Sequence, residues 1–318
     1  MTRTLPALAI GVLMTLPADV PVSRVISAQD PGLRVRLGGV EWRTGIAFAP
    51  VLPRESLDIE VRDPLLRRWT LAAPAGELTH RSPRAWRWRA PGQHGIVTAH
   101  LVGAGATEPS VELKLLVMVP ASRATDDGKL NGYRIGAYPA RPLGGNPIYL
   151  PPDGFVEVTD ENEDESLSPR FELGQFTSKQ SEAFPRYVVI DPALIVTLER
   201  LADRLDALDL PSRLHVMSGY RTPFYNHAIG NVRYSLHQWG SAADVFVDED
   251  ENGRMDDLNG DGLIDRRDAV ALFGVADTLL GPPSRGASRF AGGLGIYGAT
   301  RAHGPFLHID VRGRAARW

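Results

Sequence analysis

Histidine, aspartate and a dense acidic run lie close together in the segment YSLHQWGSAADVFVDEDENG, residues 234–253. His237 and Asp244 are too far apart for neighbours on one helical turn, and their spacing suits a turn followed by a strand. The small residues 240–243 between them permit close backbone packing. Imidazole nitrogen and carboxylate oxygen are both zinc ligands. From the spacing alone, however, a buried, hydrogen-bonded histidine and a loop-capping aspartate are the preferred explanation.

A further histidine lies in GPFLHIDVRG, residues 304–313. Phe306, His308 and Asp310 alternate there with Leu307 and Ile309, which is typical of a strand. We therefore expect His308 and Asp310 to point to the same side of that strand. Three protein ligands on zinc would leave a fourth position for water, as catalytic zinc sites do.

Three motifs, SGYRTPFYN, SLHQWGSAADV and GPFLHIDVRG, follow one another in the order seen in the zinc D-alanyl-D-alanine carboxypeptidase family, which the sequence resembles. Peptidoglycan endopeptidases and the hedgehog signalling domain belong to the same superfamily. The resemblance covers about residues 171–318, including the closing VRGRAARW. It implies that zinc is held by His237, Asp244 and His308, and that the substrate is a peptide of peptidoglycan.

The same resemblance implies a role for Arg221 in SGYRT, whose guanidinium would hold a substrate carboxylate or stabilise an oxyanion. Many family members carry a carboxylate base three residues before the last zinc histidine, where this chain has Pro305. His303 and Asp310 are the two candidates to replace that base, since zinc lowers the pKa of water but does not remove its proton. Asp310 would alternatively orient His308.

Two overlapping calcium-loop patterns form an acidic insertion at residues 248–268. Alternating carboxylates converge on one ion in such loops, and a glycine allows the sharp turn. The second loop resembles an EF-hand loop, with aspartate in place of the usual glutamate, and a solvated acidic loop is the alternative. The candidate Ca²⁺ ligands are Asp248, Asp250, Asn252 and Asp256 in the first loop and Asp257, Asn259, Asp261, Leu263, Asp265 and Asp268 in the second.

The elements that must position these residues are visible on both sides of the motifs. Asp191 is a good helix N-cap, and leucines at 194, 198, 201, 205 and 208 predict one apolar helix face that ends before Pro211. The next segment, RLHVMSG, alternates as a strand, and RRDAVALFGVADTLL predicts the helix after the second calcium loop. Residues 171–318 are thus expected to form an α+β domain, an antiparallel sheet with helices.

The first half of the chain carries a different pattern. Short runs of period two between residues 33 and 120, separated by turn-forming APGQHG and GAGATEPS, predict a small all-β, immunoglobulin-like sandwich at residues 30–120. Trp86 and Trp88 share one face there and are expected in its core. Residues 121–170, rich in Pro, Gly and Asp, predict a linker or domain edge.

In the 318-residue chain Arg3 precedes about a dozen mostly apolar residues, which predicts a signal peptide at residues 1–28 and a periplasmic or secreted protein. The net charge of −3 gives no reason to expect nucleic acid as a partner, and no later stretch is long and apolar enough to span a membrane. Without cysteine the chain forms no disulfide. The pattern leaves the oligomeric state open.

The leading hypothesis is an exported zinc metallopeptidase, a carboxypeptidase or endopeptidase acting on peptidoglycan stem peptides. Because Pro305 replaces the usual base, a non-catalytic, zinc-containing module that binds the cell wall is the alternative. A third hypothesis is a calcium-dependent adhesive protein led by its sandwich.

Overall fold

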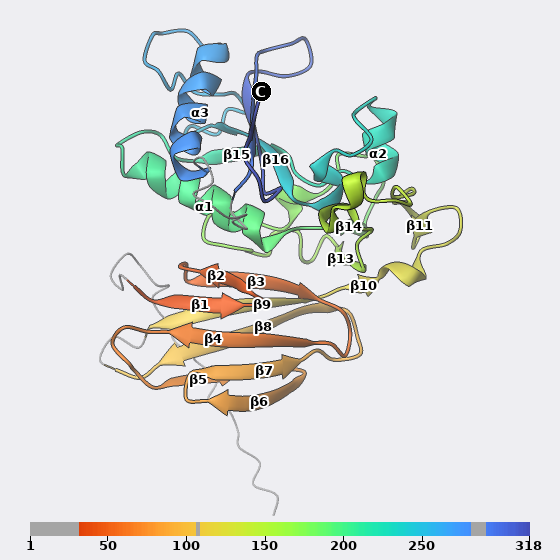
Figure 1. Cartoon of the computed structure of the whole chain (residues 1–318), viewed down its shortest axis with the longest axis vertical. Coiled ribbons are helices and arrows are strands. Elements are labelled where there is room, and N and C mark those ends of the chain that lie inside the picture. The colour runs from red at the N-terminus through yellow and green to blue at the C-terminus, as the bar shows by residue number, and fades with distance from the viewer. Residues whose placement is uncertain (1–31, 106–108, 281–290) are drawn as a thin grey trace, which may run out of the picture.

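The structure is a computed structural model that describes residues 32–105, 109–280 and 291–318 (Figure 1). The predicted signal peptide, residues 1–28, lies outside the described residues. Among the helices of the described ranges, none has the length and apolar character needed to cross a membrane.

Two sheets form the N-terminal part of the molecule, the lower half of Figure 1. The first has the strand order β2-β1-β4-β7-β6, and the second has the order β3-β9-β8-β5, in which β3 and β9 are parallel. The strands of the first sheet are β1 (Arg34–Leu37), β2 (Val40–Trp42), β4 (Ser56–Arg62), β6 (Glu77–Ser82) and β7 (Ala85–Arg89). Those of the second are β3 (Ile46–Val51), β5 (Trp69–Ala72), β8 (Gly95–Gly103) and β9 (Ser110–Val117).

Alternation explains most of the sandwich, because alternate side chains of strands such as β1, β4, β7 and β8 enter one hydrophobic core, whereas the edge strand β6 is exposed throughout. In β4 the buried residues are Leu57, Ile59 and Val61, and the charged residues between them face outward. Trp86 and Trp88 of β7 are both buried, as the sequence predicts. The immunoglobulin-like assignment stays a prediction.

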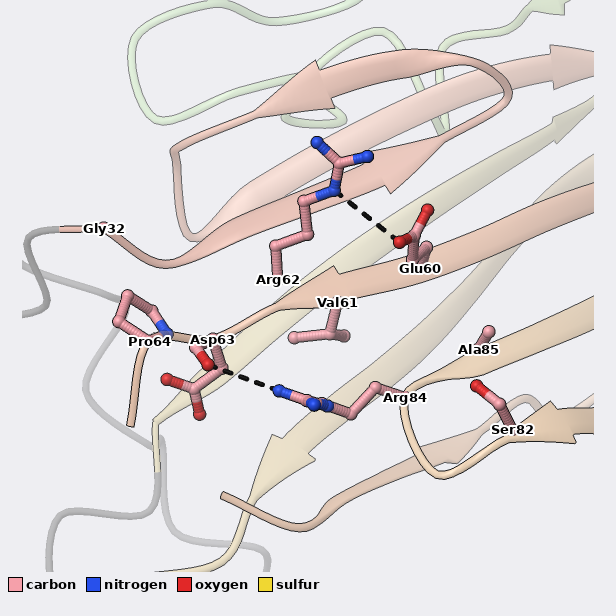
Figure 2. Close-up of a pocket in the computed structure, with 9 residues that line it drawn as sticks. All are labelled: Gly32, Glu60, Val61, Arg62, Asp63, Pro64, Ser82, Arg84 and Ala85. Atoms are coloured by element: carbon pink, nitrogen blue, oxygen red, sulfur yellow. Dashed lines mark hydrogen bonds and ion pairs between the residues drawn. The ribbon is translucent and has the colours of Figure 1, made fainter. Parts of the chain in front are cut away.

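A cavity of about 510 Å³ lies at one end of the first sheet (Figure 2). Its charged groups bond within the protein: Arg62 lies 3.6 Å from Glu60, and Arg84 donates to the Asp63 carbonyl at 3.3 Å. Burial alone would raise the pKa of Asp63, but hydrogen bonds from Arg67 and Trp69 outweigh it and lower the pKa to about 2. The carboxylate thus stabilises the sandwich from within.

Residues 121–170 connect the sandwich to the second half of the chain through a small sheet of order β10-β13-β14. Lys114 of β9 reaches Glu165 of this connection at 2.8 Å, and the first helix of the next domain packs near β2. The connection is therefore packed against both halves. The connection and the segments that flank it contain β10 (Val119–Pro120), β11 (Lys129–Leu130), β12 (Tyr133–Arg134), β13 (Gly154–Val158) and β14 (Arg186–Val188), with 3₁₀ turns at Ala121–Arg123, Leu143–Gly145, Pro147–Tyr149 and Gly174–Phe176.

A five-stranded sheet of order β15-β16-β18-β17-β19 forms the centre of the C-terminal part. All neighbouring strands are antiparallel except β17 and β19. The strands are β15 (Leu214–Ser218), β16 (Ala242–Val247), β17 (Gly293–Tyr297), β18 (Phe306–Asp310) and β19 (Ala316–Arg317). With its helices this sheet forms the expected α+β domain.

Helix α1 (Pro192–Asp206) begins as the sequence predicts, with the Asp191 carboxylate accepting from the Ala193 N–H at 2.9 Å. Helix α3 (Arg266–Leu280) packs against α1 and against β16, β17 and β18, whereas α2 (Pro223–Ala228) is short. Leu208 was expected on the buried face of the first helix, but it is 42% exposed. The reason is that α1 ends at Asp206, before Leu208 completes a further turn.

Side chains alternate along β16 and β18, so core residues lie on one face of the sheet and the candidate metal ligands lie on the other. Ala243, Val245 and Leu307 belong to the hydrophobic core on one face. Asp244 and His308 point to the other face, where they are partners across the two strands. The 3₁₀ helix η5 (Leu236–Trp239) lies just before β16 and carries His237.

Gly240 ends η5 with the left-handed backbone angle φ of 64°, and its carbonyl accepts from the Asp191 N–H at 3.0 Å. A Cβ atom at this position would lie 2.1 Å from the carbonyl oxygen of Val189. Only glycine therefore lets the chain turn from His237 into β16 against this neighbour.

Gly240→Ala should lower the melting temperature and weaken metal binding, because the backbone must move to relieve the clash. Gly230→Ala is the matched control, since Gly230 has a similar φ of 70° but open space around its Cβ position. We expect the control to cost only about 1–2 kcal/mol, the cost of a Cβ in the left-handed region. Thermal unfolding of both variants measures the difference. Equal losses in the two variants would contradict the role given to the contact with Val189.

Candidate metal centre

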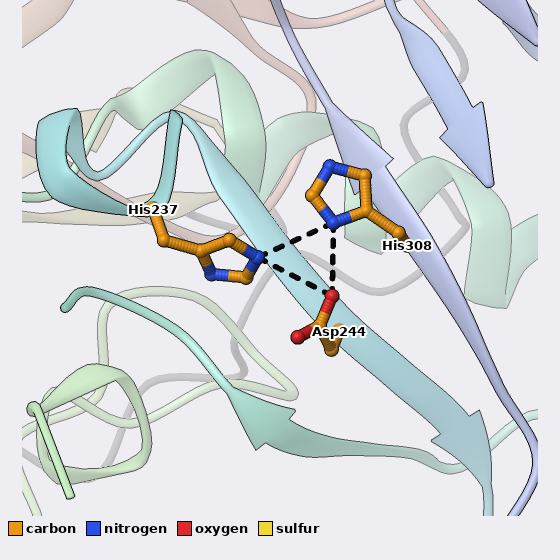
Figure 3. A group of neighbouring side chains, drawn as sticks. All are labelled: His237, Asp244 and His308. Atoms are coloured by element: carbon orange, nitrogen blue, oxygen red, sulfur yellow. Dashed lines mark hydrogen bonds and ion pairs between the residues drawn. The ribbon is translucent and has the colours of Figure 1, made fainter. Parts of the chain in front are cut away.

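Three donor atoms converge on the open face of the C-terminal sheet (Figure 3). His237 Nε2 lies 3.2 Å from His308 Nδ1 and 3.3 Å from Asp244 Oδ1. His308 Nδ1 lies 2.9 Å from the same Asp244 oxygen. All three residues are buried, with exposed fractions of 9% or less. The structure thus brings together the three zinc ligands that the resemblance implies.

Zinc fits this arrangement by donor type and by spacing. Donors about 2.0–2.1 Å from a tetrahedral zinc lie about 3.3 Å from one another, which agrees with the three separations. Two imidazole nitrogens and one carboxylate oxygen also match the ligands of catalytic zinc sites, which leave one position open. The three residues could therefore hold a zinc ion.

The outer nitrogen of each imidazole already has a partner that selects the tautomer. His237 Nδ1 faces the carbonyl oxygen of Gly219 at 2.7 Å, and His308 Nε2 faces Asp310 Oδ2 at 3.3 Å. An N–H at each outer position leaves a lone pair on His237 Nε2 and on His308 Nδ1. Both lone pairs point toward the centre, as a metal ligand requires.

The electrostatics of the centre differ between its two histidines. Burial lowers the pKa of His237, even though Asp244 lies nearby. Burial would also lower the pKa of His308, but hydrogen bonds to Asp244 and Asp310 outweigh it and raise the pKa to about 9. A dication placed between the donors replaces the proton on His308 Nδ1, so metal and protons compete for this site.

Asp310 contacts the outer edge of His308, away from the other two donors. Its carboxylate is fully buried and accepts from the Gly293 N–H at 3.0 Å and from Arg312 Nε at 2.8 Å. Burial would raise the pKa of Asp310, yet His308 and Arg312 hold it well below its usual range. This geometry favours an Asp310 that orients His308 over one that accepts a proton from water.

Arg221 lies on the opposite side of the centre. Its Nε donates to Ser218 Oγ at 2.9 Å, and one terminal nitrogen donates to Asp244 Oδ2, the oxygen that does not face the histidines. Its backbone N–H donates to the His237 carbonyl at 3.1 Å. The guanidinium therefore lies beside Asp244, on the side of that carboxylate that faces away from the histidines.

His303, the other candidate base, lies at the edge of the site. Its Nδ1 faces the Gly304 carbonyl oxygen at 2.8 Å, and its ring packs edge-on against Phe306 at 4.9 Å. None of its contacts within the described residues joins it to the three donors. A base at this position would have to act across a gap that the described contacts do not bridge.

The last residue of the chain forms a wall beside the third ligand. Trp318 packs 5.4 Å from the His308 ring, and its indole N–H donates to the Tyr297 hydroxyl at 2.9 Å. A Cβ at Gly295 would lie 2.4 Å from the indole nitrogen, so glycine makes room for the ring. The closing motif in the sequence thus packs directly against the metal centre.

The two acidic loops differ in how close their carboxylate oxygens lie to one another. Asp248, Asp250 and Asp256 of the first loop offer oxygens within 4.8 Å of one another. In the described part of the chain the acids of the second loop form no such group, although the acids of both loops accept backbone N–H groups. Asp257 accepts from Gly262 at 2.7 Å, and the buried Asp268 accepts from Leu258 at 2.9 Å.

Sequence reasoning missed three groups that hold the centre in place. They are Ser218, which orients Arg221; the Gly219 carbonyl, which orients His237; and Arg312, which orients Asp310. Ser218 and Gly219 lie in the SGYRT motif and Arg312 lies in HIDVRG, so all three belong to motifs that the sequence analysis identified. Their partners depend on pairings between distant segments.

Comparison with known proteins adds two observations. No curated protein matches the chain. One similar solved structure is a nucleoside hydrolase-related hypothetical protein from Saccharophagus degradans that is associated with carbohydrate metabolism. It is 7% identical, with a TM-score of 0.22, over 28% of this chain and 25% of that one. The similarity thus spans about a quarter of the length of that protein.

Residues 169–259 match the sequence model of the family described as Peptidase M15. The matched segment contains Arg221, His237 and Asp244, whereas His308 lies beyond it and joins the centre through the pairing of β16 with β18. The match supports a peptidase, with zinc dependence as a property of the family. Residues 169–259 of this chain are thus similar to the peptidase M15 family in the broad sense.

Proposed function

We propose that the protein is an exported zinc metallopeptidase that hydrolyses peptide bonds in peptidoglycan stem peptides. One observation carries the proposal: His237 Nε2, Asp244 Oδ1 and His308 Nδ1 converge within 3.3 Å on one sheet face. The family match around two of these residues supports a peptidase. A location in the periplasm or outside the cell is part of the proposal, because the substrate lies there.

Each residue around the centre has a separate role in the proposed hydrolysis. Zinc held by the three donors would supply an activated water and a Lewis acid for the scissile carbonyl. Arg221 lies beside Asp244 and is placed to stabilise the oxyanion that develops on that carbonyl. Gly219 and Asp310 hold the two imidazoles in the tautomers that bind metal.

Mass spectrometry of the purified protein should find about one zinc per chain, as expected for a three-ligand catalytic site. His237→Ala should lose this zinc and the hydrolysis of purified muropeptides, because one of three ligands is gone. His100→Ala, which changes an exposed histidine of the sandwich, is the control and should keep both. A well-folded wild type that takes up no zinc when it is supplied would rule out the proposal.

Asp310→Asn should weaken zinc binding about 10- to 100-fold, the usual effect of losing a partner of a metal-bound histidine. Because we assign Asp310 a positioning role, saturating zinc should restore most of the hydrolysis rate. His303→Ala tests the other candidate base and should leave zinc affinity unchanged. A rate defect of Asp310→Asn that persists at saturating zinc would instead identify Asp310 as the base.

A non-catalytic, zinc-containing module that binds the cell wall is the second candidate function. The observation that favours it is the position of the two candidate bases: Asp310 lies on the outer edge of His308, and His303 has no contact with the donors among the described residues. Zinc uptake with retention of muropeptides, but without their hydrolysis, is the result that this alternative predicts.

We also propose that the acidic insertion binds calcium and braces the domain next to β16. The three clustered carboxylates of the first loop and the glycine turns at Gly253 and Gly262, both with positive φ, support this. Asp248 is buried and lies directly after β16, so an ion there would stiffen the strand that carries Asp244.

Calcium added to zinc-loaded, calcium-free protein should raise the melting temperature by roughly 5–10 °C at 100 times the dissociation constant. Asp250→Asn removes one clustered carboxylate and should abolish most of the shift. Asp209→Asn, an exposed acid outside the loops, is the control. An equal shift in Asp250→Asn would show that calcium acts elsewhere.

The strand order of the sandwich supports the further proposal that it is immunoglobulin-like. One sheet holds β1, β4, β7 and β6 in that order, and the other holds β9, β8 and β5. These orders correspond to the two sheets of an immunoglobulin constant-type domain.

A further inference from the structure

Lysine is rare in this arginine-rich chain and occurs only as Lys114, Lys129 and Lys179. Lys114 lies 2.6 Å from Glu112 and 2.8 Å from Glu165, and Lys129 lies 2.6 Å from Asp127. Lys179 is exposed and has no carboxylate at ion-pair distance in the described ranges of the chain. One of the three lysines therefore carries a charge that the described protein does not pair.

The backbone around Lys179 is held against the loop that carries Arg221. The Tyr220 N–H donates to the Phe176 carbonyl at 2.9 Å. Thr222 Oγ1 donates to Gln180 Oε1 at 2.6 Å, and its N–H donates to Ser178 Oγ at 3.4 Å. Both neighbours of Lys179 are thus buried and hydrogen-bonded to Thr222, the residue after Arg221, whereas Lys179 itself is exposed.

Charged residues of the metal centre affect the pKa of Lys179. Neighbouring atoms displace part of the water around its side chain and lower its pKa; the positive charge of Arg221 lowers the pKa further, while Asp244 opposes this. A lysine whose charge interacts with both Arg221 and Asp244 lies near the metal centre. The hydrogen bonds of Phe176, Ser178 and Gln180 to residues 220–222 hold the backbone on both sides of Lys179 in place.

We propose that Lys179 is a specificity-determining residue that binds a carboxylate of the peptide substrate on the Arg221 side of the metal centre. The inference rests on the proposed peptidase function and deepens it. Two cations lie on this side, and Arg221 already donates to Asp244 and Ser218. The ammonium of Lys179, which no described carboxylate pairs, is thus a second cationic group that can bind a carboxylate of the substrate while Arg221 faces the oxyanion.

Stem peptides offer two sources of such a carboxylate: the C-terminal α-carboxylate and the free α-carboxylate of a γ-linked glutamyl residue. A C-terminal carboxylate at Lys179 would direct cleavage to the last peptide bond and define a carboxypeptidase. An inner carboxylate would instead place an internal bond at the metal. Peptides that differ only in amidation at one of these positions separate the two sources.

The first test compares wild type with Lys179→Met on L-Ala-γ-D-Glu-L-Lys-D-Ala-D-Ala and on its two singly amidated forms. Losing one charge-assisted hydrogen bond should raise KM about 10- to 100-fold for peptides that keep the recognised carboxylate, with little change in kcat. The peptide amidated at that carboxylate should show no further loss. Lys179→Arg should restore part of the affinity, and Lys129→Met is the control with an unrelated, ion-paired lysine.

The second test measures how accessible the Lys179 ammonium is to a reagent, and it does not depend on catalysis. Acylation of the zinc-loaded protein with acetic anhydride, mapped by mass spectrometry, gives the reaction rate of each lysine. Saturating peptide acid, over a time shorter than its turnover, should slow acylation of Lys179 at least several-fold and leave Lys129 unchanged. The matching amide should protect Lys179 less.

The outcomes separate the two proposals. A KM increase confined to peptides with one free carboxylate, with matching protection from acylation, supports the assignment and names the source. Equal losses of Lys179→Met on all peptides, or acylation of Lys179 unaffected by peptide acid, overturns it. If the wild type hydrolyses none of the peptides, the proposed function fails, and protection of Lys179 by the acid but not the amide still decides the binding role.

Discussion

The register between β16 and β18 is the constraint on which the centre depends. Asp244 and His308 are partners across these strands, so their side chains emerge together on the face opposite the helices. A slip of one residue in either strand would turn one ligand into the core, because side chains alternate with period two. Valine, leucine and isoleucine on the core face oppose such a slip, since it would expose them. The hydrophobic core thus determines where the ligands lie.

Much of this arrangement could be predicted from local patterns in the sequence. The Asp191 cap and the leucine spacing predicted α1, and the alternation around His308 predicted that Asp310 shares its side of the strand. These predictions succeed because a cap or an alternating strand is encoded within a few residues. The prediction for Leu208 was wrong, since the end of α1 is set by the turn that follows the helix rather than by the leucine spacing.

The remaining features depend on contacts between distant segments, which local patterns do not contain. The side of His308 that Asp310 contacts follows from Arg312 and the Gly293 N–H. Lys179 acquires its position from hydrogen bonds across more than forty residues, between Gln180 and Thr222. The EF-hand resemblance in the sequence lies in the second acidic loop, whereas the first loop gathers its carboxylates more closely. Local sequence patterns therefore identify candidate site residues, but contacts between distant segments determine which of them lie together.

The separation of the ligands along the chain has a consequence for the order of assembly. His308 and Asp244 are 64 residues apart in sequence and meet only when β18 docks beside β16. An unfolded chain therefore holds no preformed three-donor site, and the full set of donors exists only after the sheet closes. Metal acquisition would then be a late event in the maturation of this protein, and its rate would report on closure of the sheet. A chain delivered unfolded across a membrane would have to take its metal from the compartment where it folds.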